Sequence, residues 1–326
     1  MDGDTPAAKL KVVSSTIAVR LFTDPGCPWG YSARPALARL AWRFGDQLDW
    51  RLTLIGLTDS PEEYDQRGFT PALMAVAVRD FERRFRMPFG VVVKPRMAAT
   101  ARACRAVIAA REISPRLGWS ALHALQLLQF GSPRLLDDDA ALRGALAGVD
   151  GLDADAIVAA IDTPEIVAAY DVDRALARAA HGTPTHIQGR HADSDGAIRY
   201  TAPSVRFEDL RSGETVEVGG FQPFESYDTV LANLAPDLVR RAAPDDSLAV
   251  LGFFAHDMTT AEVAAVMRSS DTDDHVYADT EARLIELAAE GRVVGRPVAG
   301  SATWRLATAT DANRPDGAVG VTSVAA

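Results

Sequence analysis

Cys27 is the residue of this chain whose sequence surroundings best suit covalent chemistry. It stands in the run Asp24-Pro25-Gly26-Cys27-Pro28-Trp29-Gly30-Tyr31, directly after an apolar segment and before a helical pattern. Proline suits the first turn of a helix, because its missing N–H costs nothing there. The unpaired amides at a helix N-terminus stabilise a thiolate and can lower a cysteine pKa from ~8.5 to ~3.5–7.5. We therefore expect Cys27 to be a nucleophile at neutral pH.

Two predicted strands and one predicted helix position this cysteine. Residues 16–22 and 48–57 show the apolar content and alternation typical of strands. The helix between them has one apolar face, formed by Leu37, Leu40, Ala41 and Phe44. This order predicts a parallel pair of strands joined by a right-handed crossover.

The next part of the chain is almost wholly helical, from about residue 60 to 180. Thr163 before Pro164 is typical of a helix start. Beyond Gly182, the segments THIQGR and AIRYTAPSV flank HADSDG, which predicts an antiparallel hairpin, and 224–238 predicts a last helix. Two sheet segments separated by many helices indicate one α/β domain with a helical domain inserted into it.

Residues 245–306 predict three helices followed by a hairpin, which is the order of a winged helix. Thr259 and Glu262 form a capping-box pattern at the second helix. Winged helices commonly bind DNA, but residues 243–306 hold eleven Asp or Glu against five Arg. An acidic surface opposes contact with phosphates. We therefore expect a packing or protein-interaction module and no nucleic-acid partner.

Composition limits the classes of protein to which the chain can belong. It has 326 residues, of which 48% are hydrophobic and 24% charged, so it can form more than one folded core. The net charge of -10 opposes binding to nucleic acid or anionic membranes. Residues 1–13 lack the pattern of a secretory signal, and the two cysteines do not suit a disulfide scaffold. These features predict a cytoplasmic protein without a membrane partner.

The segment around Cys27 resembles the active site of DsbA-like thioredoxin-fold proteins, especially the cytoplasmic branch related to FrnE. There a CPWC-type tetrapeptide follows the first strand. The resemblance covers much of 15–236 and has a second anchor at Gly182-Thr183-Pro184-Thr185, in the place of the family's cis-proline loop. It implies that Pro184 is cis and packs against Cys27, and that Thr183 offers backbone groups to a bound thiol or peptide. Pro28, Trp29 and Gly30 would complete the substrate-binding residues.

The fold class expected from these patterns is α/β. It is a thioredoxin fold with an inserted helical domain and a small C-terminal winged-helix-like domain. The expected boundaries are a flexible N-terminus at 1–13, the thioredoxin fold at 14–58 and 181–238, the helical insertion at 59–180, the winged-helix-like domain at 245–307 and a flexible tail at 308–326.

Gly30 is the main departure from the family pattern, because it stands where the second active-site cysteine is expected. A disulfide within the tetrapeptide is impossible, so a mixed disulfide at Cys27 must be released by an external thiol. This favours monothiol chemistry, either thiol–disulfide exchange or transfer of a low-molecular-weight thiol. The substrate would be a small thiol or a protein disulfide. Mycothiol or glutathione would serve as cosubstrate, and no bound cofactor is expected.

Two other function classes stay open. Loss of the second cysteine also fits a non-catalytic adaptor that holds a protein partner through its C-terminal module. A weaker alternative is a redox-responsive regulator in which the wing binds nucleic acid.

The remaining candidate residues have structural interpretations. Cys104 lies in an apolar helical stripe and is expected to pack in a core. No metal-site spacing occurs among the histidines, which are expected in solvated loops, namely His181, His186, His191 and His256. No metal is therefore predicted.

Overall fold

A four-stranded mixed sheet lies at the centre of the larger part of the chain. A computed structural model describes residues 16–308 and 311, except 194, 255 and 271–274. The strand order is β2-β1-β5-β6. The strands are β1 (Ile17–Thr23), β2 (Leu48–Leu54), β5 (Ser204–Asp209) and β6 (Thr215–Gly219).

The predicted parallel pair is confirmed, because β1 and β2 run parallel with Ile17 opposite Leu48. Strand β5 pairs antiparallel with the other edge of β1, and β6 pairs antiparallel with β5. Between β1 and β2 the chain forms α1 (Pro28–Ser32), α2 (Arg34–Phe44) and the short 3-10 helix Gly45–Gln47. Of the expected apolar stripe, Leu37, Leu40 and Phe44 are buried. The first strand therefore delivers the chain directly into α1.

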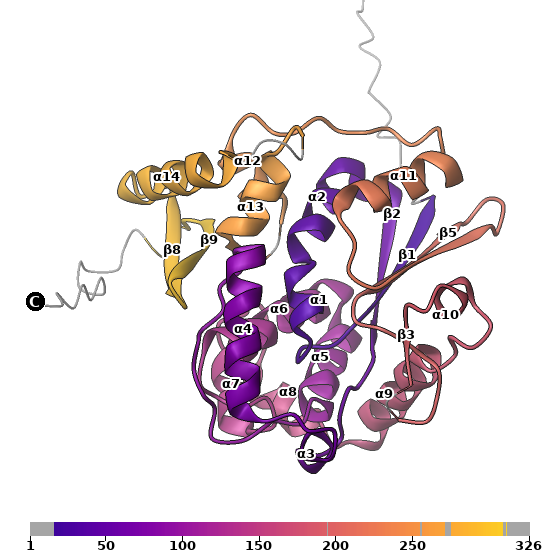
Figure 1. Cartoon of the computed structure of the whole chain (residues 1–326). Helices are drawn as coiled ribbons and strands as arrows, with labels where there is room; N and C mark the ends of the chain where they lie inside the picture. The colour runs from indigo at the N-terminus through magenta and orange to yellow at the C-terminus, as the bar shows by residue number, and fades with distance from the viewer. Residues whose placement is uncertain (1–15, 194, 255, 271–274, 309–310, 312–326) are drawn as a thin grey trace, which may run out of the picture.

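The predicted helical insertion follows β2. Thr163 is the N-cap of α9, with Pro164 at its first position, as predicted. Figure 1 shows most of these helices below the sheet and α4 to its left, while α2 and α11 (Phe224–Leu234) lie above it. The inserted helices are α3 (Glu62–Gln66), α4 (Pro71–Phe85), α5 (Ala101–Ile113), α6 (Pro115–Gly131), α7 (Asp139–Leu146), α8 (Ala154–Ala160) and α9 (Pro164–Ala177).

The predicted hairpin after Gly182 is wrong in its first half. The residues expected as its first strand form helix α10 (Pro184–Ile187) instead. Thr183 is the N-cap of this helix and accepts a hydrogen bond from the backbone N–H of His186, which favours a helical turn over a strand. What remains of the hairpin is the pair β3 (His191–Ala192) and β4 (Arg199–Tyr200).

The C-terminal part contains the predicted order of three helices and a hairpin, plus one short strand that was not predicted. The capping box at Thr259 and Glu262 is confirmed. Helix α13 packs on α2, so this part rests on the longer of the two helices between β1 and β2. The elements are α12 (Ser247–Phe253), β7 (Met258–Thr259), α13 (Thr260–Met267), α14 (Val276–Ala289), β8 (Val293–Val298) and β9 (Ser301–Leu306).

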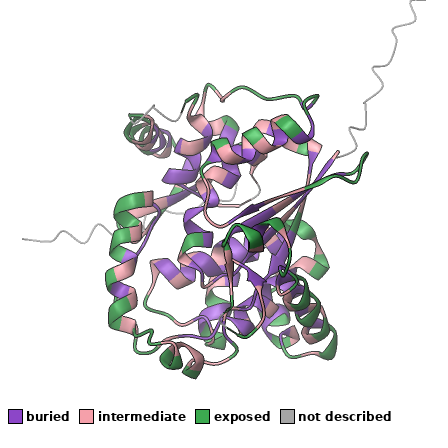
Figure 2. Cartoon of the chain, turned by 45° about the vertical axis from the view of Figure 1, so that its right-hand side comes forward, coloured by how far each residue is buried: buried purple, intermediate pink, exposed green. Residues whose placement is uncertain are grey.

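One continuous apolar core joins the sheet to the inserted helices. Figure 2 shows the strands and the inner helix faces buried, with exposed residues on the outer faces. A second cluster joins Trp42 of α2 to the C-terminal helices. Within the described residues, no helix combines the length and apolarity required to cross a membrane. The predicted flexible ends, 1–13 and 308–326, lie outside the described residues except for 308 and 311.

Candidate functional site

Cys27 is the N-cap of α1, with Pro28 at the first helical position, as predicted. Its side chain is only 8% exposed. It belongs to a small apolar cluster that draws residues from four distant segments of the chain. The other buried members are Phe22, Ile55, Ala177, Ala180, Tyr200 and Ala202.

The prediction that the pKa of Cys27 is lowered is wrong. Burial raises the pKa of Cys27 from 9.0 to about 11. Hydrogen bonds from the backbone N–H groups of Gly30 and Trp29 oppose this shift, so the expected helix N-terminus effect is present. Loss of hydration outweighs it, and the negative charge of Asp24 adds to the increase. In the resting state Cys27 is therefore a neutral thiol.

Asp24, three residues before Cys27, is a fully buried carboxylate. Its oxygens accept hydrogen bonds from the backbone N–H groups of Gly26 (2.8 Å) and Leu57 (3.0 Å) and from the Thr100 hydroxyl (3.0 Å). Burial raises the pKa of Asp24 despite these donors. The carboxylate thus ties the active-site turn to the segments after β2 and before α5.

The cis-proline expected at Pro184 lies at Pro203 instead. The cis bond joins Ala202 to Pro203, immediately before β5. The Cys27 Sγ–H donates a hydrogen bond to the Ala202 carbonyl oxygen at 3.1 Å. Because β5 pairs with β1, with Ser204 opposite Phe22, this loop lies beside the end of the strand that leads to Cys27.

Thr183 and Pro184, predicted to bind substrate, occupy the start of α10, where Pro184 is exposed. The Thr183 hydroxyl donates to the Ala180 carbonyl at 2.8 Å, so it supports the segment that packs near Cys27. The backbone that faces the thiol belongs to Ala202. No local sequence signal separates these two X-Pro pairs, because the choice depends on which strand pairs with β1.

Gly30 lies where a second cysteine would stand, at the inner side of α1. A Cβ atom at this position would lie 3.7 Å from the Cys27 Cβ but only 2.7 Å from the Thr23 Oγ1. The first distance is normal for a disulfide, whose Cβ atoms lie ~3.5–4.5 Å apart. The second is too short, so the hydroxyl of Thr23 fills part of the space that a side chain would need.

Trp29, the residue between Pro28 and Gly30, is 39% exposed and forms an aromatic surface beside Cys27. Its ring lies 4.7 Å from Phe81, 5.9 Å from Phe85 and 5.6 Å from Phe221, between ring centres. Phe81 and Phe85 come from α4. The turn that bears Cys27 thus adjoins an apolar surface made by the inserted helical part.

Cys104 is fully buried in the main core, as its apolar stripe predicts. Its Sγ–H donates to Asp24 Oδ2 at 3.4 Å, and burial raises its pKa. Both cysteines are free thiols.

The prediction of solvated loops is wrong for His256. Its ring centre lies 3.9 Å from that of His123 in α6, in a pocket that also holds Glu262. The nearest ligand atoms of His123, His256 and Glu262 lie within 4.8 Å of one another. This cluster was missed because its members come from distant segments.

No family model matches the chain, and no curated protein matches it. Solved structures do. A protein of Nitrosomonas europaea, provisionally assigned as a protein disulfide isomerase, shares 15% sequence identity, with a TM-score of 0.50 over 67% of this chain and 97% of the other. This likeness shows a DsbA-like thioredoxin fold.

Two further structures have lower TM-scores. One is a provisionally assigned DsbA oxidoreductase of Streptomyces coelicolor, at 18% identity and a TM-score of 0.49 over 71% of this chain and 97% of the other. The second is the cytosolic disulfide reductase DsbM of Pseudomonas aeruginosa, at 21% identity and 0.47, over 67% of this chain and 100% of the other.

Proposed function

We propose that this DsbA-like thioredoxin-fold chain is a monothiol thiol–disulfide oxidoreductase whose nucleophile is Cys27. One observation carries the proposal: the Cys27 Sγ lies 3.1 Å from the Ala202 carbonyl of the cis-proline loop, at the start of α1. The thiol of Cys27, the N-terminus of α1 and the backbone carbonyl of Ala202 therefore lie together. The backbone of Ala202 and Pro203 takes the substrate-binding role that the sequence suggested for Thr183 and Pro184.

The proposed reaction needs one external disulfide and one external thiol. The Cys27 thiolate attacks a disulfide RS–SR′, forms a mixed disulfide with RS and releases R′S⁻, which takes up the proton that Cys27 lost. An external thiol R″SH then gives up its proton, and its thiolate attacks the sulfur of RS. RS–SR″ leaves, and Cys27 regains the proton. Because Gly30 carries no thiol, the second step is intermolecular.

The substrate class that we propose is a low-molecular-weight thiol of the glutathione or mycothiol kind, or its mixed disulfide. Such thiols belong to the reducing pool of the cytoplasm, where we place the reaction. The aromatic surface around Trp29 and Phe85 would cover the apolar part of a bound disulfide. This surface supports a substrate larger than the thiol alone.

The raised pKa of Cys27 has a direct kinetic consequence. A thiol with a pKa of about 11 is ionised in only about one molecule in ten thousand at pH 7. Exchange should therefore be slow at neutral pH and should accelerate about tenfold per pH unit below the pKa.

The burial and raised pKa of Cys27 also favour a second candidate function, a non-catalytic adaptor. A buried neutral thiol without a second cysteine is what a scaffold used only for binding would retain. In that case the C-terminal module, which packs on α2, would hold a protein partner.

Two measurements separate the candidates. Wild type, Cys27→Ser and Cys104→Ser are incubated with a glutathione mixed disulfide and free glutathione, and turnover is followed from pH 7 to 10. Mass spectrometry then identifies the adduct. If the protein is the proposed enzyme, wild type should carry a glutathione adduct on Cys27, and Cys27→Ser should abolish turnover. Cys104→Ser serves as the matched control because its hydroxyl can still donate to Asp24.

If the protein is an adaptor, no variant should show turnover above background. Cys27 should then stay unmodified at pH 8. That result would remove the catalytic proposal.

A further inference from the structure

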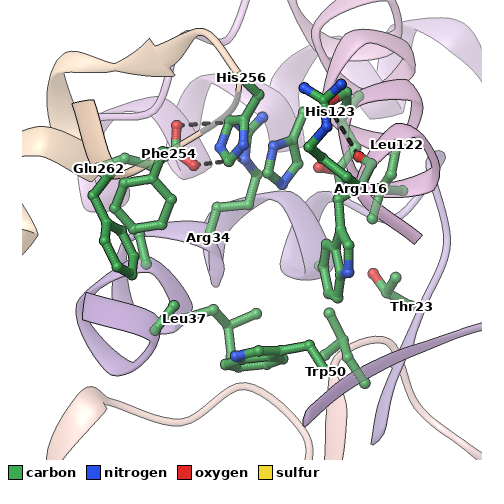
Figure 3. Close-up of a pocket in the computed structure, with 18 of the residues that line it drawn as sticks. Thr23, Arg34, Leu37, Trp50, Arg116, Leu122, His123, Phe254, His256 and Glu262 are labelled. Carbon is green, nitrogen blue, oxygen red and sulfur yellow. Dashed lines mark hydrogen bonds and ion pairs between the residues drawn. The ribbon is translucent and has the colours of Figure 1, made fainter. Parts of the chain in front are cut away.

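The pocket that holds His123, His256 and Glu262 is a cavity of about 280 Å³ where the sheet, the inserted helices and the C-terminal part meet. It touches the active-site turn only at Thr23 and Gly30, and Cys27 does not line it. Figure 3 shows His123 and His256 at one end of the cavity, with Leu37 and Trp50 at the opposite end.

Four polar atoms of the lining have no hydrogen-bond partner among the described residues. They are Arg34 Nη1, His123 Nδ1, Gln126 Oε1 and His256 Nε2. Arg34, His123 and Gln126 are only 4%, 9% and 1% exposed. Buried polar atoms normally find partners, because each one left without a partner costs free energy. Several unpaired atoms on one cavity point to a ligand that would pair with them.

The charged side chains that line the cavity suit a ligand with a single negative charge. Arg34 forms a bidentate ion pair with Glu262, with both N–O distances at 2.9 Å, so the charges of these two side chains cancel. Arg116 adds one positive charge. Burial lowers the pKa of both His123 and His256, the latter to about 4, so neither imidazole is charged at neutral pH. The cavity is thus locally cationic in a chain whose net charge is -10.

Four Trp and Phe side chains form part of the cavity wall. Trp50 and Trp119 meet edge to face, with ring centres 5.9 Å apart, and Phe253 and Phe254 close the C-terminal side. An apolar cavity of about 150 Å³ binds benzene, so one nearly twice that size can take two fused rings.

We propose that this cavity binds a small aromatic carboxylate of about two fused rings. Its carboxylate would accept hydrogen bonds from Arg34 Nη1 and from imidazole N–H groups. Its rings would lie along Trp50 and Phe254. A hydroxyl on the far ring would donate to Gln126 Oε1.

A metal ion is the competing occupant, since His123, His256 and Glu262 lie close together. The environment of Glu262 opposes it. Glu262 Oε2 already accepts hydrogen bonds from Arg34, from the backbone N–H of Thr259 and from its hydroxyl, and Oε1 accepts one from Arg34. The adjacent guanidinium repels a cation. The volume of the cavity also exceeds the needs of an ion.

The test is calorimetric titration of the full chain with 2-naphthoate and 6-hydroxy-2-naphthoate. Wild type should bind both probes at one site. The hydroxylated probe should bind about fivefold more tightly, which is the effect of one added hydrogen bond. The cationic analogue 2-naphthylmethylammonium should bind at least tenfold more weakly than 2-naphthoate.

Two variants test the named contacts. Gln126→Leu should remove the advantage of the hydroxylated probe, and His123→Phe should weaken both naphthoates. Each should also raise the Tm of the ligand-free protein, because each removes an unpaired buried polar group. Gln129→Leu is the matched control: it makes the same change one turn along α6, where the side chain pairs with Lys94 outside the cavity. Its affinities should equal those of wild type.

Three results would overturn the proposal. One is the absence of saturable naphthoate binding to folded wild type. Another is equal affinity for the probes in wild type, Gln126→Leu and His123→Phe. The third is stoichiometric Zn²⁺ binding that His123→Phe abolishes and that naphthoate does not compete with, which would assign a metal site instead.

Discussion

The hydroxyl of Thr23 occupies the space that a side chain at position 30 would need. A Cβ on Gly30 would approach the Thr23 Oγ1 to 2.7 Å, while it would lie 3.7 Å from the Cys27 Cβ. The backbone of the turn that bears Cys27 is therefore compatible with a disulfide between positions 27 and 30. The side chain at the end of β1 is what opposes it.

Replacing Gly30 by cysteine should restore a dithiol site only when Thr23 is also made smaller. We expect Thr23→Ala/Gly30→Cys to form an intramolecular disulfide on mild oxidation, because the spacing suits one. Gly30→Cys alone should be less stable than wild type by about 1–3 kcal/mol, through overpacking. Thiol counting, intact mass and urea unfolding measure these effects. A double variant that keeps all its thiols after oxidation would show that the turn is not arranged as described.

The pKa of Cys27 should be visible as a rise in alkylation rate that continues to about pH 11. Cys104→Ser provides the background in which only Cys27 reacts, and Cys27→Ser in parallel reports unspecific reaction. An alkylation rate that levels off near pH 7 would contradict the raised pKa. It would mean that the helix N-terminus lowers the pKa of Cys27 more than burial raises it.

The same shift predicts how Cys27 affects stability with pH. The folded state holds the proton more tightly than the unfolded state, so this contribution is complete below pH 9 and is lost as the pH rises from 9 to about 11. Between pH 8 and 11.5, wild type should lose about 2 to 3 kcal/mol more stability than Cys27→Ser. Urea unfolding at several pH values measures the difference. Equal losses in both proteins would contradict it.

Asp24→Asn should lower the pKa of Cys27, because the carboxylate adds to the increase that burial causes. It should also destabilise the fold by about 1–3 kcal/mol, since an amide cannot accept all the hydrogen bonds that reach this carboxylate. Alkylation rates and urea unfolding measure the two effects. Asp49→Asn, at an exposed pair with Arg51, is the control. An unchanged pKa in Asp24→Asn would rule out the proposed charge effect.

The buried ion pair of Arg34 and Glu262 should show strong coupling. Its side chains are 4% and 1% exposed. Arg34→Met or Glu262→Gln alone should cost about 3–5 kcal/mol, because each leaves a buried charge without its partner. The double variant should cost less than the sum of the two single changes. A double-mutant cycle in urea measures this, and simple additivity would contradict the coupling.

Local patterns were sufficient to predict much of the fold. The apolar run of β1, the alternation in β2 and the stripe at Leu37, Leu40 and Phe44 depend only on neighbouring residues, and the structure forms both strands and buries these three side chains. The capping box at Thr259 is local in the same way. These features predict elements and their buried faces.

The errors arose where distant segments decide the outcome. Thr183-Pro184 and Ala202-Pro203 look alike in sequence, but only the second precedes the strand that pairs with β1. The pKa of Cys27 depends on Ile55, Ala177 and Tyr200, which cover it from other elements. The approach of His123 to His256 likewise spans two parts of the chain that no motif connects.

The ion pair between α2 and α13 has a consequence for work with shortened chains. Arg34 is the first residue of α2, which follows the short helix that Cys27 caps, and its partner Glu262 comes from the C-terminal part. A fragment that stops near residue 244 would retain the guanidinium and lose the carboxylate, together with the apolar cover over Trp42. A defect of such a fragment would therefore have two causes, the loss of the C-terminal part and damage to the part of the chain that bears Cys27. Substituting methionine at position 34 would be needed to separate the two.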